Sequence, residues 1–269
     1  MRLGISSYTF TWAVGVPGYA VNNPMSAVQL LEKAVSLEVA CVQIADNMPL
    51  HLYDHTQLSS LKKQAEALQM AVEVGTRGLS PENIHTYLDI AEQFGSPILR
   101  AVIDAPDFEP AIPEIIMILR QLRPELEKRR IKLAIENHDR FKVREFVEIL
   151  EAVPSAFIGI CLDSVNSMGA GEGVHIVTEF LAPYTFNLHV KEFVVRRIDH
   201  KMGFQIEGRP VGEGMLPLAW MLEKLTPNCT SAILEQWVPP EKTMAETITK
   251  EEAWARHSIA YLKSILYQR

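Results

Sequence analysis

Hydrophobic residues along this chain gather in short runs that alternate with longer amphipathic segments. The short runs are rich in Val, Ile and Leu and are bounded by turn formers or charges, which is typical of buried strands. Eight runs are expected to be strands: 3–6, 41–46, 72–77, 98–104, 132–137, 158–163, 186–192 and 232–237.

The segments between these runs carry apolar residues at three- and four-residue spacing, which predicts helices. The clearest are 26–38, 58–70, 81–94 and roughly 245–267. The first turn of a helix tolerates proline, because the backbone N–H groups there have no partner within the helix. Pro24, Pro81 and Pro113 therefore indicate helix starts, with Ser80 as an N-cap before Pro81. Gly95 is expected to end the third helix.

Strict alternation of strands and helices implies parallel strands joined by crossover helices. Eight units of about 34 residues match a (β/α)8 barrel, so residues 1–269 are expected to form one α/β domain, a single TIM barrel. An open doubly wound sheet is the alternative, but the chain has no GxGxxG motif. Residues 194–214, polar and glycine-containing, are expected to form a long loop over the barrel mouth between strands seven and eight.

Composition narrows the class of protein. Hydrophobic residues make up 48% of the chain and charged residues 22%, which predicts a folded, soluble protein. A net charge of −7 argues against nucleic acid as a partner. The three cysteines (41, 161 and 229) form no CxxC pair, and no long apolar segment indicates a membrane span or a signal peptide. We therefore expect a reduced, cytoplasmic protein with no membrane contact.

The last four predicted strands each end in a side chain that can bind a metal. These side chains are Glu136, Asp163, His189 and Glu235. Strand ends meet at one face of a barrel, where three carboxylates and an imidazole would repel one another without a cation. The alternative is that each pairs with a neighbouring Lys or Arg. The donor set favours one divalent ion, Mn²⁺ or Mg²⁺, with Co²⁺ or Zn²⁺ able to substitute.

These residues lie in motifs that resemble the xylose isomerase-like TIM-barrel superfamily. The motifs are LAIENH (133–138), ICLDSVN (160–166), LHVKE (188–192), VGEG (211–214) and AILE (232–235). The resemblance implies that Glu136, Asp163, His189 and Glu235 bind one divalent metal, Mn²⁺ first. It further implies that Glu136 and Glu235 act as acid and base on opposite faces of a small sugar. It also suggests a homo-oligomer, a dimer or tetramer.

Two features depart from the ketose 3-epimerases of that superfamily. After the metal-binding aspartate those enzymes show a pattern similar to D-x-x-H, in which the histidine contacts a substrate oxygen. Asn166 stands at the position of this histidine, and His138 is expected to replace its contact. A cationic group lies between 191 and 209, within which Lys191 and then Arg209 are the best candidates to bind a substrate carboxylate or phosphate. A solvated loop of mixed charge is the alternative for this group. Trp237 is expected to wall the pocket or to pack in the core.

Two functions follow from this set of residues. The first is a metal-dependent isomerase or epimerase that acts on a small keto sugar through a metal-bound enediolate. The alternative is a metal-dependent decarboxylase of a 3-oxo sugar acid, because HVKEFVVRR (189–197) and EQWVPPE (235–241) resemble enzymes acting on acids such as 3-oxo-isoapionate.

Two further classes are disfavoured. An endonuclease IV-like repair enzyme would need more strand-end histidines and a basic face. A barrel that only binds sugars would not need two opposed glutamates. Polar residues near the ends of strands two to four are expected to support the site rather than catalyse: Gln43, Asp46, Glu73, Arg77, Arg100 and Asp104.

Overall fold

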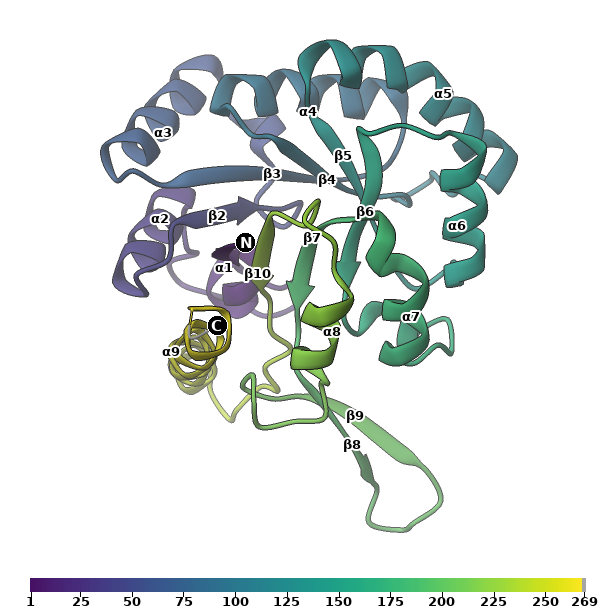
Figure 1. The fold of residues 1–269 in the computed structure, drawn as a ribbon. Helices are drawn as coiled ribbons and strands as arrows, with labels where there is room; N and C mark the ends of the chain where they lie inside the picture. The colour runs from purple at the N-terminus through teal and green to yellow at the C-terminus, as the bar shows by residue number, and fades with distance from the viewer. Residues whose placement is uncertain (268–269) are drawn as a thin grey trace.

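Eight parallel strands close into a barrel, as the alternation of strand and helix predicts (Figure 1). The computed structural model describes residues 1–267. Strand β1 pairs with both β2 and β10, which completes the ring. The barrel strands are β1 (Arg2–Ser6), β2 (Cys41–Ile44), β3 (Ala71–Arg77), β4 (Ile98–Val102), β5 (Lys132–Glu136), β6 (Ile158–Asp163), β7 (Thr185–Val190) and β10 (Ser231–Leu234).

Helices surround the barrel and connect its strands (Figure 1). They are α1 (Thr11–Val14), α2 (Ala27–Ser36), α3 (His55–Ala67), α4 (Pro81–Phe94), α5 (Ile112–Arg129), α6 (Val143–Ala152), α7 (Val174–Leu181), α8 (Leu218–Lys224) and α9 (Met244–Tyr267). Short 3₁₀ turns complete the connections: Ser7–Phe10, Leu50–Leu52, Asn166–Met168 and Ala182–Tyr184.

Local sequence signals explain where α2 and α4 begin and end. The Ser80 side chain accepts a hydrogen bond from Asn83 N, and Gly95 takes the left-handed conformation (φ 65°) that ends α4. The expectation that Pro24 begins a helix is wrong. Helix α2 begins at Ala27, because Ser26 accepts from Gln29 N and forms a capping box.

The segment between β7 and β10 differs from the long loop expected over the mouth. Strands β8 (Phe193–Arg197) and β9 (Phe204–Gly208) pair antiparallel, and this hairpin projects from the barrel (Figure 1). Ile198 N donates to Gly203 O across the turn, where Lys201 has a left-handed φ of 64°. The polar composition of the segment reflects a hairpin that is solvated over most of its length, and α8 follows it.

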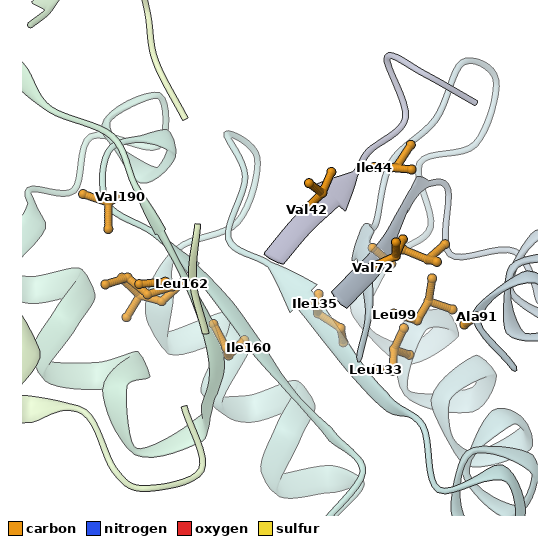
Figure 2. Packing of buried hydrophobic residues seen from close by; sticks show 14 of the residues in the cluster. Val42, Ile44, Val72, Ala91, Leu99, Leu133, Ile135, Ile160, Leu162 and Val190 are labelled. Carbon is orange, nitrogen blue, oxygen red and sulfur yellow. The ribbon is translucent and has the colours of Figure 1, made fainter. Parts of the chain in front are cut away.

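Side chains alternate along each barrel strand, and this alternation places the site. Leu133 and Ile135 on β5, like Ile160 and Leu162 on β6, pack in the buried layer between barrel and helices (Figure 2). Residues between them face the barrel interior. A separate small cluster there contains Ile98, Ala134, Cys161 and Phe186. The same alternation makes the polar residues at the carboxyl ends of these strands face the barrel interior.

None of the helices in the described part of the chain is both long and apolar enough to span a membrane.

Candidate active site

The four predicted metal ligands meet at the carboxyl ends of the strands. Glu136 and Asp163 are the last residues of β5 and β6, His189 lies in β7, and Glu235 follows β10. All four are at most 2% exposed. The Nδ1 atom of His189 is 3.4 Å from Glu136 Oε2, 3.8 Å from Asp163 Oδ2 and 3.4 Å from Glu235 Oε1. Alternation explains the convergence, since each side chain takes an inward-facing strand position.

This donor set fits a divalent cation. Asp163 Oδ2, His189 Nδ1 and Glu235 Oε1 are buried and have no hydrogen-bond partner in the described structure, although such atoms are normally satisfied. Carboxylate oxygens with one imidazole nitrogen suit Mg²⁺, Mn²⁺ or Zn²⁺. The Sγ atom of Cys161 also lies within reach of Glu136 and His189. Burial raises the pKa of that thiol, so Cys161 stays protonated and the oxygens and imidazole remain the stronger donors.

A hydrogen-bond chain orients His189. Its Nε2 lies 2.7 Å from Gln43 Oε1, and Gln43 Nε2 donates to Glu73 Oε2 at 3.1 Å. With the amide of Gln43 held this way, Nε2 is the ring nitrogen that donates to it, and Nδ1 is the nitrogen that faces the carboxylates and is left to bind a metal. Gln43 and Glu73 thus support the site, as their place near the ends of strands two and three suggested.

Glu136 is held by two donors. Arg100 Nε donates to Glu136 Oε2, and Asn166 Nδ2 donates to Oε1 at 2.7 Å. Arg100 also contacts Asp46 Oδ1 at 2.6 Å, and Asp46 accepts from the Tyr8 hydroxyl at 3.0 Å. Burial lowers the pKa of Arg100, but Glu136 and Asp46 raise it by more, so the guanidinium stays charged. Both oxygens of Glu136 are therefore engaged.

Lys191 inserts its ammonium between two of the predicted ligands. Its Nζ is 2.9 Å from Asp163 Oδ2, as an ion pair without hydrogen-bond geometry, and 3.0 Å from Glu235 Oε2. It also lies 5.3 Å from the centre of the Trp237 ring. Burial raises the pKa of Glu235, but His189 and Lys191, with Arg100, outweigh it and lower the value to about 2. Glu235 is consequently ionised and a weak base in this arrangement.

The mouth of the barrel forms a cavity of about 200 Å³ above these groups. Its lining combines three cations with the predicted acids: Tyr8, Arg77, Arg100, Glu136, His138, Asp139, Asn166, Lys191, Glu235 and Trp237. His138 Nδ1 lies 3.3 Å from Asp139 Oδ2 at the rim, and Trp237 is 41% exposed there.

Of the cationic segment 191–209, only Lys191 lines the mouth cavity among the described residues. Arg209 does not reach it, because it pairs with Glu207 at 3.0 Å and donates to Gly208 O. Arg77 and Arg100 line it from the other side. The sequence predicts only supporting roles for both. Arg77 ends β3 and Arg100 is the middle residue of β4, and their inward-facing positions are the signal that places them at the mouth.

Comparison with known proteins identifies the family of this chain. The model of the xylose isomerase-like TIM barrel family matches residues 31–265. A 3-oxo-isoapionate decarboxylase from Pectobacterium atrosepticum is 31% identical over 264 residues, which cover 97% of this chain and 95% of that protein.

Solved structures share the fold at low identity. A D-psicose 3-epimerase crystallised in the presence of D-fructose superimposes with a TM-score of 0.73 at 14% identity and covers 99% of each chain. A xylose isomerase-like TIM barrel protein from Mycobacterium smegmatis in complex with magnesium gives a TM-score of 0.70 at 13% identity, over 97% of each chain. With a family model that matches most of its length, this chain belongs to the xylose isomerase-like TIM barrel family.

Proposed function

We propose that this protein is a metal-dependent decarboxylase of a 3-oxo sugar acid. The observation that carries the proposal is that three cations lie among the acids that line the mouth cavity: Arg77, Arg100 and Lys191 border it directly beside the predicted ligands. Such a lining suits a substrate that bears a carboxylate. The similarity to a 3-oxo-isoapionate decarboxylase over nearly the whole chain supports the same substrate class.

The chemistry of a 3-oxo acid explains why this arrangement would suffice. The bond between the carboxylate carbon and its neighbour breaks, CO₂ leaves, and the electron pair moves onto the 3-oxo group to give an enolate. A proton then returns to the carbon that lost CO₂. A divalent ion held by Glu136, Asp163, His189 and Glu235 would supply the positive charge that stabilises the developing oxyanion.

The hydrogen bonds of the two glutamates favour decarboxylation over proton abstraction. Glu136 accepts from Arg100 and Asn166, and Glu235 Oε2 is paired with Lys191. Cations and amide donors beside a carboxylate stabilise its ionised form and so make it a weaker base toward a proton on carbon. Decarboxylation removes no such proton. Burial lowers the pKa of Lys191, but Asp163 and Glu235 raise it by more, so its ammonium stays charged in the cavity and can bind the substrate carboxylate.

An isomerase or epimerase of a small keto sugar is the second candidate. Glu136 and Glu235 both line the mouth cavity, and each has one oxygen 3.4 Å from His189 Nδ1. Two carboxylates at one site are what proton exchange on two faces of a sugar requires. For either reaction we propose Mn²⁺ as the ion, with Mg²⁺, Co²⁺ or Zn²⁺ as alternatives. A cytoplasmic homo-oligomer stays a prediction.

Proton NMR in D₂O separates the two candidates. The Mg²⁺-loaded protein avoids paramagnetic broadening and is offered 3-oxo sugar acids, ketoses and ketose phosphates. Loss of carboxylate with one deuterium on the neighbouring carbon is the result expected for the decarboxylase. A new stereoisomer or isomer, with deuterium incorporated and no CO₂ released, would replace it by the second candidate. Turnover of none of these substrates would contradict both proposals.

A further inference from the structure

A second and larger hollow opens beside the mouth cavity. It has a volume of about 470 Å³ and lies between the base of the β8–β9 hairpin, the segment after β1 and the segment after β10. We call it the side cleft. Four residues line both hollows: Tyr8, Lys191, Glu235 and Trp237. The two hollows are therefore adjacent, and these four side chains stand at their common border.

The walls of the side cleft beyond these shared residues are mainly apolar. They include Trp12, Val16, Ile206, Val238 and Pro239. The indole of Trp12 is fixed in the wall, because its Nε1 donates to Val238 O at 2.8 Å. Ile206 on β9 is 45% exposed and Trp237 is 41% exposed. Exposed apolar side chains around a concave surface are typical of a ligand site.

Several polar side chains of the side cleft are engaged within the protein, although Gln236 Oε1 is buried there without a hydrogen-bond partner. The Thr11 hydroxyl donates to Tyr8 O at 3.0 Å, and Glu207 is paired with Arg196 and Arg209. A sugar placed here would meet fewer free partners than it has hydroxyl groups, and each hydroxyl that loses water without a new hydrogen bond costs free energy. An apolar group has no hydrogen bonds with water to lose, and its transfer from water into the cleft is favourable.

We propose that the side cleft binds an apolar, ring-sized substituent carried by the acid substrate. The carboxylate end lies at the cations of the mouth cavity, and the substituent extends past Trp237 toward Ile206. The substrate class becomes a 3-oxo sugar acid that bears an aryl or alkyl group. This assignment rests on the proposed function for the carboxylate end only.

The test uses malonate and benzylmalonate as probes, titrated by calorimetry into the Mg²⁺-loaded protein. Both probes carry two carbonyl-type groups at the spacing of a 3-oxo acid, and benzylmalonate adds one phenyl ring. We expect benzylmalonate to bind about tenfold more tightly than malonate. Ile206→Gln removes an apolar wall, and Val16→Gln does so independently from another part of the lining. Each should reduce the preference to about threefold or less and leave malonate binding unchanged.

Met202→Gln is the matched control. Met202 is 85% exposed at the tip of the same hairpin and does not line the side cleft, so the tenfold preference should persist. Equal affinity for the two probes in the unaltered protein would overturn the assignment. An equal effect of the Ile206 and Met202 variants would do the same. If the preference holds but no 3-oxo acid is decarboxylated, the proposed function fails and the side cleft stands as an apolar binding site.

Discussion

Arg100 on β4 donates from its Nε to the Glu136 carboxylate at the end of β5, and both side chains are at most 2% exposed. The sequence predicts that Arg100 only supports the site and that Glu136 acts in it, and this hydrogen bond joins the two. The same guanidinium contacts Asp46 at 2.6 Å, so one cation bridges two carboxylates. Without it, Glu136 would face the other acids of the site uncompensated.

Replacing Arg100 by Met should therefore destabilise the protein strongly. Breaking a buried ion pair leaves an unpaired charge, which costs about 3–5 kcal/mol. Urea unfolding monitored by circular dichroism measures the change. Arg77→Met is the matched control, because Arg77 pairs with the same Asp46 at 3.0 Å but is partly exposed, and its loss should cost about 1 kcal/mol or less. An equal decrease in the free energy of unfolding in the two variants would show that the buried Arg100 pair stabilises the protein no more than the partly exposed Arg77 pair does.

Asp163→Asn should abolish most divalent-ion binding. The substitution keeps the Oδ1 that accepts from Val165 N and Asn166 N at 2.8 Å, so the local turn is preserved. It replaces Oδ2, which has no hydrogen-bond partner and is paired with Lys191, by an amide nitrogen that is a poor ligand. Calorimetric titration with Mn²⁺ should show at least about a 100-fold weaker Kd. Asp104→Asn, which removes only a partly exposed pair with Arg140, should bind Mn²⁺ as the unaltered protein does.

Removal of the metal should lower the melting temperature. A cation that binds only the folded state stabilises it, by about 2.7 kcal/mol at 100 times its Kd. Differential scanning calorimetry with added Mn²⁺, and again after EDTA, measures the shift. The Asp163→Asn variant is the control and should show almost no shift. If EDTA shifts both proteins equally, the ion acts elsewhere on the chain.

Gln43→Leu should weaken metal binding without removing a ligand. The side chain of Gln43 accepts from His189 Nε2 and fixes the orientation of the ring. Loss of such a partner typically costs about 10–100-fold in metal affinity. Mn²⁺ titration gives the Kd, and urea unfolding of the metal-free protein gives the structural cost separately. An unchanged Mn²⁺ affinity would show that the ring is held by packing alone.

Much of the fold and the convergence of the four candidate ligands could be predicted because both follow from short-range periodicity. A strand that is apolar on both faces and ends in Glu136 or Asp163 places that acid at the barrel mouth, whatever the rest of the chain does. The contacts of Arg100 could not be predicted this way. They depend on the register of β4 against β5, where Arg100 pairs with Ala134, and on Asp46 arriving from β2. Register is a property of the closed barrel.

The β8–β9 hairpin and the position of Arg209 could not be predicted from the sequence either. Residues 194–214 are polar, and polarity alone does not separate a loop from a solvated hairpin. Arg209 was expected in the pocket because it precedes the VGEG motif. The neighbouring Glu192 instead anchors this region, accepting from Gly212 N at 3.1 Å and Leu216 N at 2.8 Å. That contact fixes the base of the hairpin and leaves Arg209 beside Glu207.

Glu251 on α9 predicts a pH dependence of stability. Its carboxylate is buried and accepts from Trp12 N and Ala13 N at 2.9 and 3.1 Å, yet burial dominates and raises its pKa from 4.5 to about 8. The folded state thus holds a proton that the unfolded state has lost between about pH 4.5 and 8, so stability falls as pH rises through this window.

Replacing Glu251 by Gln should flatten this dependence, because the amide does not ionise. Urea unfolding at pH 5.5, 7 and 8.5 gives the free energy of unfolding of each protein, and the slope between these values should be smaller in the Glu251→Gln variant by up to a few kcal/mol over the window. Glu252→Gln is the matched control: Glu252 is the next residue on α9 but is partly exposed and paired with Lys33, so its loss should leave the slope unchanged. A slope that stays steep in the Glu251→Gln variant would assign the pH dependence to other groups.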